Sequence, residues 1–155
     1  MNPRPIAIVV ADDDEEDREL TRLAFDRGRL TNEVRFCVDG IDLLDYLYQR
    51  GRWAPPEDAP RPGAILLDLN MPRMDGREAL KAIKSDPDLR SIPVVVLTSS
   101  KAEEDVLRSY DLGVNSFITK PVTLTGLTEV LEVWSKYWFQ IVELPPPVHS
   151  GAEAR

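Results

Sequence analysis

Hydrophobic positions along the chain form two kinds of pattern. Segments 6–11, 64–67 and 92–97 are almost entirely apolar, which is typical of strands buried on both faces of a parallel sheet. Between such runs, apolar residues recur at the three- and four-residue spacing of amphipathic helices. The pattern predicts strands over 6–11, 33–38, 64–68, 92–97 and 114–119, and helices over 14–27, from 39 onward, from 75 to before 87, from 100 onward and over 123–142.

Several local signals define where these helices begin and which side they bury. Asp75 with Glu78, and Ser100 with Glu103, have the spacing of a capping box at a helix start. Segment 51–63 contains four prolines and no periodicity, so we expect a surface loop there. The predicted buried stripes are Leu20, Leu23 and Ala24 in the first helix, Leu43, Leu44, Leu47 and Tyr48 in the second, Ala79, Leu80 and Ile83 in the third, and Val106, Leu107 and Tyr110 in the fourth.

The order of elements is strand then helix, five times over. Five parallel strands with helices on both faces make an α/β, flavodoxin-like, doubly wound sheet, with strand order 2-1-3-4-5. A (βα)8 barrel would need eight such units and is excluded. We expect a single domain over 6–142, with terminal tails at 1–5 and 143–155.

Composition narrows the classes of function. Of the 155 residues, 43% are hydrophobic and 30% charged, with a net charge of −8, which argues against a nucleic-acid-binding surface. The one cysteine, Cys37, falls in a predicted strand and excludes a disulfide within the chain. No apolar run approaches the roughly 18 residues of a membrane span, and no secretory signal is evident. We therefore expect a cytoplasmic protein without membrane contact.

Charged residues stand at the ends of three predicted strands. Asp68 ends one of them, the acidic run 12–17 follows another, and Lys120 with Pro121 follows a third. In open α/β sheets, ligands bind at the carboxyl edge of the strands, so these residues are predicted to share one site. The alternative for Asp68 is that it only begins a turn, and a solvated helix start explains residues 14–17 well.

A cluster of Asp12, Asp13 and Asp68 would need a cation. At about 4 Å and an effective dielectric constant of about 20, each pair of carboxylates costs about 4 kcal/mol. Lys120 is one candidate for the compensating charge, and a hard divalent ion is the other. Carboxylates with water select Mg²⁺, with Mn²⁺ as a substitute. An open Mg²⁺ site beside a lysine suits the handling of a phosphoryl group.

The motifs together resemble the receiver domain of two-component response regulators. The resemblance covers roughly residues 6–135 and keeps the order and spacing of the family's motifs. These motifs are the acidic pair 12–13, Leu-Leu-Asp68-Leu-Asn-Met-Pro-Arg-Met-Asp-Gly, Val-Leu-Thr98-Ser-Ser and Ile-Thr-Lys120-Pro.

The resemblance implies roles at the acidic site. Asp68 would be the phosphoacceptor, which attacks a phosphoryl group and forms an acyl phosphate. Asp13, Asp68 and the backbone carbonyl of Asn70 would bind Mg²⁺, and Asp12 would hold a metal-bound water. A second aspartate two residues after the nucleophile, which a phosphatase of the haloacid dehalogenase class needs as general acid, is replaced here by Asn70.

The resemblance also implies a switch. Thr98 and Lys120 would bind the phosphoryl oxygens, Phe117 would take the family's aromatic switch position, and the bond before Pro121 would be cis. Phosphorylation would draw the Thr98 hydroxyl toward the phosphoryl group and vacate space for Phe117, which makes a two-state element. Without the motif, the favoured interpretation of Thr98 is an ordinary strand-end threonine, and that of Phe117 is a plain core aromatic.

The phosphoryl donor and the output are expected to be other proteins. The one histidine, His149, lies in a proline-rich tail and is a poor internal donor, and no Walker-type loop is present. The family implies a sensor histidine kinase as donor. The sequence after 142 leaves no room for an output domain, so output is expected through binding or onward transfer, and no enzymatic turnover is expected.

The fifth predicted helix carries more apolar surface than one buried face needs. Its second half is rich in aromatic residues, which indicates an interface, although the proline-rich tail covering this surface remains an alternative. This helix end and the long loop at 51–63 are similar to single-domain regulators that pair with phytochrome-type kinases, including bacteriophytochromes, often as homodimers. The predicted dimer or partner surface is Trp134, Tyr137, Trp138, Phe139 and Ile141.

Three hypotheses remain distinct at this point. The first is a phosphorylation-dependent signalling switch, which all four motifs support. The second is an interaction module with the receiver shape that is not phosphorylated. The third is a haloacid-dehalogenase-type phosphatase, whose nucleophile normally lies near the start of its domain rather than on a third strand.

Overall fold

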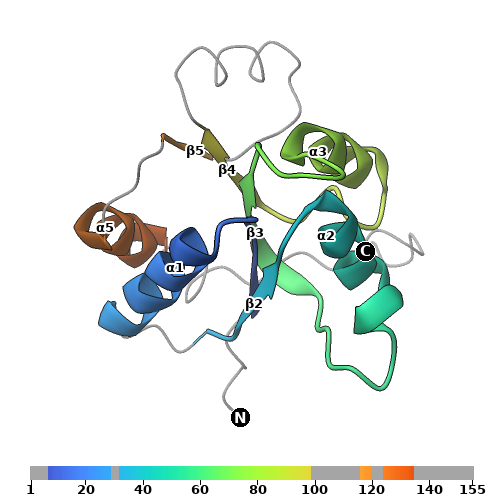
Figure 1. Cartoon of the computed structure of the whole chain (residues 1–155), viewed down its shortest axis with the longest axis horizontal. Coiled ribbons are helices and arrows are strands. Elements are labelled where there is room, and N and C mark those ends of the chain that lie inside the picture. The colour runs from blue at the N-terminus through green and yellow to red at the C-terminus, as the bar shows by residue number, and fades with distance from the viewer. Residues whose placement is uncertain (1–6, 29–31, 99–115, 120–123, 135–155) are drawn as a thin grey trace, which may run out of the picture.

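The chain forms a five-stranded parallel sheet covered by helices on both faces (Figure 1). The structure is a computed structural model, and it describes residues 7–28, 32–98, 116–119 and 124–134. Its elements are β1 (Ala7–Ala11), α1 (Glu15–Arg27), β2 (Val34–Cys37), α2 (Gly40–Tyr48), the 3-10 helix η1 (Gly51–Trp53), β3 (Pro62–Asp68), α3 (Gly76–Ser85), β4 (Val94–Thr98), β5 (Ser116–Thr119) and α5 (Leu124–Trp134).

The strand order is β2-β1-β3-β4-β5, as predicted. The first strand in sequence therefore lies inside the sheet, between β2 and β3. Every residue of β1 and of β3 is buried, as expected for strands covered on both faces. The flavodoxin-like doubly wound fold is confirmed.

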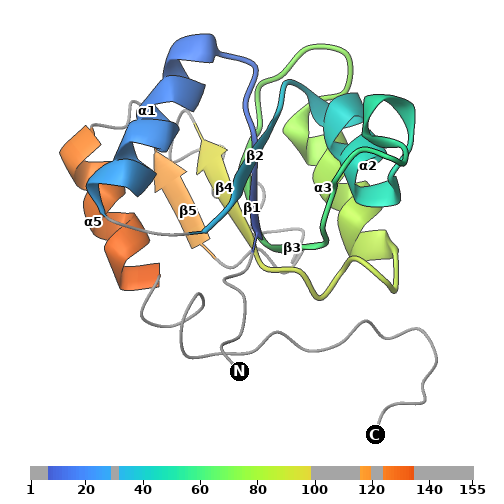
Figure 2. The ribbon, with the colours of Figure 1, turned by 90° about the horizontal axis from the view of Figure 1, so that it is seen from below.

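Two apolar layers hold the helices to the sheet, because alternate strand residues point to opposite faces. Figure 2 shows α1 and α5 on one face and α2 and α3 on the other. On the α2/α3 face the buried strand residues include Val9, Ile65 and Val96. On the α1/α5 face they include Ile8 and Leu66. Within the described part of the chain, no helix is long and apolar enough to cross a membrane.

Helix starts follow the local signals in the sequence. Asp14 is the N-cap of α1 and accepts hydrogen bonds from the backbone N–H groups of Glu16 and Asp17. At α3, Asp75 and Glu78 form the predicted capping box. The fourth predicted helix lies outside the described residues.

Two predicted stripes are partly wrong. In α1, Leu23 is 44% exposed, and the buried residues are Thr21, Ala24 and Phe25. In α2, Tyr48 is 43% exposed whereas Tyr46 is buried.

The long loop is more ordered than predicted. It contains η1, and β3 begins at Pro62, two residues before the predicted start. Tyr46 and Trp53 meet edge to face with ring centroids 4.8 Å apart, and the Tyr46 hydroxyl donates to the carbonyl oxygen of Pro60 at 2.7 Å. The loop therefore buries a second side of α2, which explains why Tyr46 faces inward.

Candidate functional site

Parallel pairing at the centre of the sheet brings the predicted acidic residues together. Ala11 of β1 pairs with Leu67 of β3, so Asp12, just after β1, and Asp68, the last residue of β3, lie at the same edge of the sheet. Ligand oxygens of Asp12, Asp13 and Asp68 lie within 4.8 Å of one another. The structure therefore brings together two of the three strand ends that were predicted to share a site, while Lys120, at the third, lies outside the described residues.

The three carboxylates differ in their access to solvent. Asp12 is 1% exposed and Asp68 is 2% exposed, whereas Asp13 lies at the surface. Ionised carboxylates are costly to bury unless they are hydrogen-bonded or bound to a cation. The cluster thus has a buried floor and one side that is open to an incoming ligand.

Local turn bonds hold both buried carboxylates. The backbone N–H of Asp14 donates to Oδ1 of Asp12 at 3.0 Å, and the N–H of Asn70 donates to Oδ1 of Asp68 at 3.2 Å. The alternative interpretation of Asp68 as a turn residue is therefore also correct. The same two hydrogen bonds fix the direction of each carboxylate. The turns that follow the strands therefore also orient the carboxylates of the site.

The backbone on the β1 side is tied from two directions. The N–H of Asp12 donates to the carbonyl oxygen of Cys37 at 3.0 Å, and Nη1 of Arg18 donates to the carbonyl oxygen of Asp12 at 2.8 Å. The contact from Arg18 was not predicted, because nothing in the sequence distinguishes this arginine from others on an exposed helix start. Together the two contacts fix the point at which the acidic run leaves the sheet.

The donor set fits a small, hard divalent cation. Three carboxylates at this spacing repel one another by roughly 3 kcal/mol per pair at an effective dielectric constant of about 20. Oxygen donors suit Mg²⁺ and Mn²⁺ rather than the softer transition metals. One exposed and two buried carboxylates also leave room for water, which Mg²⁺ usually retains.

The basic and switch side of the site is described only in its backbone. Thr98 ends β4 and pairs with Thr119, the residue before Lys120, while Phe117 pairs with Val96. The side chains of Thr98 and Phe117 are not described. Lys120 and Pro121 lie outside the described residues, as do Tyr137, Trp138, Phe139, Ile141 and the side chain of Trp134.

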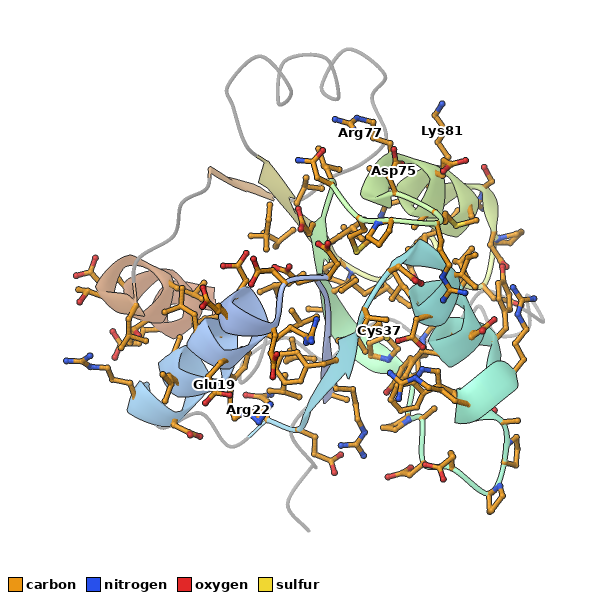
Figure 3. The ribbon with its side chains drawn as sticks, viewed as in Figure 1. Glu19, Arg22, Cys37, Asp75, Arg77 and Lys81 are labelled. Carbon is orange, nitrogen blue, oxygen red and sulfur yellow. The ribbon has the colours of Figure 1, made fainter. Side chains whose placement is uncertain are left out.

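Cys37 lies beside this edge but is not equipped for chemistry. It ends β2 and is buried in the apolar layer under α2 and α3 (Figure 3). Burial, with a further contribution from the charge of Asp42, raises the pKa of its thiol far above the ordinary value. A thiol that stays protonated is a poor nucleophile and a poor metal ligand, so Cys37 belongs to the core.

An ion pair between Arg73 and Asp39 had no signal in the sequence. Nε of Arg73, in the loop after Asp68, donates to Oδ2 of Asp39 at 2.6 Å. Asp39 was expected to open α2, and it does so through a bond from the N–H of Asp42 at 2.8 Å. Its contact with Arg73 joins segments far apart in sequence, which no local pattern can reveal.

The chain is similar in sequence to known response regulators. The family model of the response regulator receiver domain matches residues 8–132. Response regulator Rcp1 of Synechocystis sp. is 40% identical over 144 residues, which cover 93% of this chain and 95% of Rcp1.

Solved structures give the same result. The phosphorylated cyanobacterial phytochrome response regulator RcpA superimposes with a TM-score of 0.77 at 41% identity, covering 90% of this chain and 98% of RcpA. The Mn²⁺-bound form of Rcp1 gives a TM-score of 0.76 at 39% identity, covering 91% and 99% of the two chains. The predicted similarity to phytochrome-associated regulators is confirmed by these relatives. Because the family model covers most of the chain, the protein belongs to the family of response regulator receiver domains.

Proposed function

We propose that this protein is a signalling switch that accepts a phosphoryl group on Asp68 in a reaction that depends on Mg²⁺. The observation that carries the proposal is the cluster of Asp12, Asp13 and Asp68, whose ligand oxygens lie within 4.8 Å at the carboxyl edge of the sheet. Such a cluster does not stabilise the fold by itself, because its carboxylates repel one another. It is well suited to a divalent cation together with a phosphoryl group.

The cation would be held as the family implies. Asp13, Asp68 and the backbone carbonyl of Asn70 would bind Mg²⁺ directly, and Asp12 would bind through a water. Bound there, Mg²⁺ would supply positive charge against the phosphoryl oxygens. The Mn²⁺-bound form of Rcp1 supports Mn²⁺ as a substitute.

The chemistry at Asp68 is the transfer of one phosphoryl group from a phosphohistidine of the donor protein to the Asp68 carboxylate. A carboxylate oxygen of Asp68 attacks phosphorus, the bond from phosphorus to the donor nitrogen breaks, and its electron pair stays with the imidazole. The hydrogen bond from the N–H of Asn70 to Oδ1 of Asp68 fixes the direction of this carboxylate. No separate substrate is turned over, so the protein acts as a phosphoacceptor and not as a phosphatase.

The response to phosphorylation would pass through β4 and β5. Thr98 and Lys120 would bind the phosphoryl oxygens, and Phe117 would move into space that the Thr98 side chain leaves. The cis bond at Pro121 would set the direction of the chain after Lys120. Adjacent positions of Thr98 and Thr119 in the sheet support this assignment, because they bring the two strand ends side by side.

The partners follow from the relatives and from the sequence pattern. A sensor histidine kinase of the phytochrome type, such as a bacteriophytochrome, would donate the phosphoryl group, as the name of RcpA suggests. The aromatic end of the fifth helix, with Trp134, Tyr137, Trp138, Phe139 and Ile141, would form a homodimer or partner surface.

Intact-mass spectrometry with acetyl phosphate and Mg²⁺ tests the central residue. The wild-type chain is expected to gain one phosphoryl mass, and Asp68→Asn is expected to gain none. Chelating Mg²⁺ is expected to abolish the gain in the wild type. Phosphate uptake that survives in Asp68→Asn would overturn the assignment, and a wild-type chain that takes up no phosphate would favour the unphosphorylated interaction module.

Asp14→Asn is the matched control. It removes an acidic group from the same run, and asparagine still caps a helix, so α1 is retained. We expect normal phosphorylation of this variant.

Size-exclusion chromatography with light scattering, on the phosphorylated and the unphosphorylated wild-type chain, then tests whether the protein forms the proposed dimer.

A further inference from the structure

The loop between β3 and α3, residues 69–75, is held against the start of α2. The N–H of Gly40 donates to the carbonyl oxygen of Met74 at 2.9 Å. Arg73 donates to the Asp39 carboxylate, and the N–H of Gly76 closes the loop on the carbonyl oxygen of Leu69 at 2.9 Å. The loop that follows the proposed phosphoacceptor is thus fixed at three points, two of them on the residues that open α2.

The backbone of the β3–α3 loop lies too close to the start of α2 to leave room for a side chain at Gly40. A Cβ at position 40 would lie 2.4 Å from the carbonyl oxygen of Met74, and a Cβ at position 76 would lie 2.2 Å from that of Asp68. Both distances are below any real contact of a Cβ atom, so the close approach depends on glycine at each position. The β3–α3 loop and the start of α2 therefore pack as one unit.

Arg73 has an unusual backbone for its residue type. Its φ is +64°, in the left-handed region that residues other than glycine and asparagine rarely adopt. Such a conformation persists where surrounding contacts hold it, and these cases concentrate at functional sites. The contact that holds Arg73 is its hydrogen bond to Asp39 at 2.6 Å.

Asp39 uses both carboxylate oxygens. Oδ1 accepts from the N–H of Asp42 at 2.8 Å, and Oδ2 accepts from Nε of Arg73. The residue is 3% exposed, and a buried carboxylate without its cation would be costly. Asp39 therefore anchors the position of Arg73, and with it the loop that carries Asn70.

We propose that Arg73 and Asp39 are positioning residues that set the affinity of the acidic cluster for Mg²⁺. The inference rests on the proposed function of that cluster. The loop supplies Asn70, whose N–H bonds to Asp68 and whose carbonyl is an assigned ligand. Residues that orient ligands around a metal typically change its affinity by about 10- to 100-fold when they are removed.

Simple electrostatics would act differently on the two residues. Removing the positive charge of Arg73 would strengthen binding of a cation, whereas removing the negative charge of Asp39 would weaken it. Positioning requires that both changes weaken binding, because each breaks the same contact. The directions in which the two variants change the Kd for Mg²⁺ therefore distinguish a positioning role from a direct effect of charge.

The test measures the Kd for Mg²⁺ by isothermal titration calorimetry with the unphosphorylated chain. Arg73→Asn removes the ion pair with a residue that tolerates the left-handed backbone, and Asp39→Asn retains the cap of α2. We expect about tenfold weaker binding for each variant, and no further weakening in the double variant, since the two residues act through one contact. Unchanged Kd values, shifts of opposite sign or an additive double variant would overturn the inference.

Arg52→Ala is the control for a purely structural effect. Arg52 is paired with Asp42 much as Arg73 is with Asp39, with side-chain exposures of 56% and 6% against 58% and 5%. Arg52 joins η1 to α2 and to the carbonyl oxygen of Phe36, and its hydrogen bonds do not involve the β3–α3 loop. Arg52→Ala should therefore lower stability and leave the Kd for Mg²⁺ unchanged. A matching loss of Mg²⁺ affinity in Arg52→Ala would also overturn positioning.

The wild-type chain separates the two proposals. Suppose that the wild-type chain binds Mg²⁺ and takes up phosphate, and that the Arg73 and Asp39 variants bind Mg²⁺ with the same Kd as the wild type. The positioning role of Arg73 and Asp39 is then wrong, and the proposed function stands. If the wild-type chain binds no Mg²⁺, the proposed function fails and the inference fails with it.

Discussion

At the scale of single residues, Asp42 shows how a buried charge is kept in this fold. It is 5% exposed and accepts hydrogen bonds from the N–H of Val38 at 3.0 Å, from Arg52 at 2.8 and 2.9 Å, and from Nε1 of Trp53 at 2.9 Å. Burial alone would raise the pKa of this carboxyl, but the bond from Arg52 and the other donors outweigh burial and lower it. Asp42 therefore ties the long loop to α2 in its ionised form.

The lowered pKa of Asp42 predicts a specific dependence of stability on pH. An unfolded aspartate has a pKa of about 3.9, so stability from the ionised group is complete above that pH and is lost as pH falls through the folded pKa. Asp42→Asn should cost about 1–3 kcal/mol at pH 7, and the difference from wild type should narrow below about pH 4. Urea denaturation across this range measures both.

Asp58→Asn is the control for this prediction, because Asp58 pairs with Arg35 at 3.0 Å but its side chain is 74% exposed. It should change stability little at any pH. A cost of Asp42→Asn that stays constant down to pH 2 would contradict a role for the ionised carboxylate.

Residue-level prediction from the sequence succeeded where one pattern dominated. Asp12 and Asp68 could be placed because Asp12 directly follows a buried strand and Asp68 ends one. Leu23 and Tyr48 were placed wrongly, since the buried face of α1 is turned by one residue and the loop at 51–63 covers another side of α2. Helical spacing defines a stripe, but only packing decides which of two neighbouring stripes is buried.

At the scale of elements, α3 begins at a complete capping box. The N–H of Glu78 donates to Oδ1 of Asp75 at 3.1 Å, and the N–H of Asp75 donates to Oε1 of Glu78 at 3.3 Å. Figure 3 shows Asp75 at the helix start, with Arg77 and Lys81 pointing away from the sheet. The cap fixes where the β3–α3 loop ends and the helix begins.

Loss of this cap should have a measurable cost. Asp75→Ala is expected to lower the free energy of unfolding by about 1 kcal/mol, whereas Asp75→Asn should retain most of it, because asparagine also caps. Urea denaturation of the three proteins checks this. Equal losses in both variants would instead assign the effect to the charge of Asp75, whose other oxygen lies 3.5 Å from Nη1 of Arg77.

The elements themselves were largely predictable, and their ends were not. All five strands and their order follow from the sequence, because buried parallel strands and amphipathic helices have different periods. The early start of β3 at Pro62 and the short helix η1 were missed. Both lie in a proline-rich segment without periodicity, where tertiary contacts such as that between Trp53 and Asp42 decide the structure.

At the scale of the whole molecule, the acidic cluster adds repulsion to a chain of net charge −8. A ligand that binds only the folded state stabilises it, by about 2.7 kcal/mol at 100 times its Kd. Mg²⁺ should therefore raise the Tm of the wild type. Asp13→Asn should have a higher Tm than wild type without Mg²⁺, since one repelling charge is gone, and should respond less to Mg²⁺.

Thermal denaturation with and without Mg²⁺ measures both effects, with Asp58→Asn as a control that should keep the full response. A wild-type Tm that does not change with Mg²⁺, or an Asp13→Asn response equal to wild type, would contradict metal binding at this cluster. The site as a whole was predictable only on the acidic side. The ion pair between Arg73 and Asp39 depends on how two loops meet in the finished fold.

The position of β1 inside the sheet has a consequence for synthesis of the protein. β1 leaves the ribosome before both strands that flank it, and one of them, β3, follows only after α1, β2, α2 and η1. The step that closes the middle of the sheet, pairing Ala11 with Leu67, is the same step that brings Asp68 to Asp12 and Asp13. On the proposed function, a nascent or partly folded chain has no cation site that could support phosphorylation. Only the folded protein would then be phosphorylated and signal.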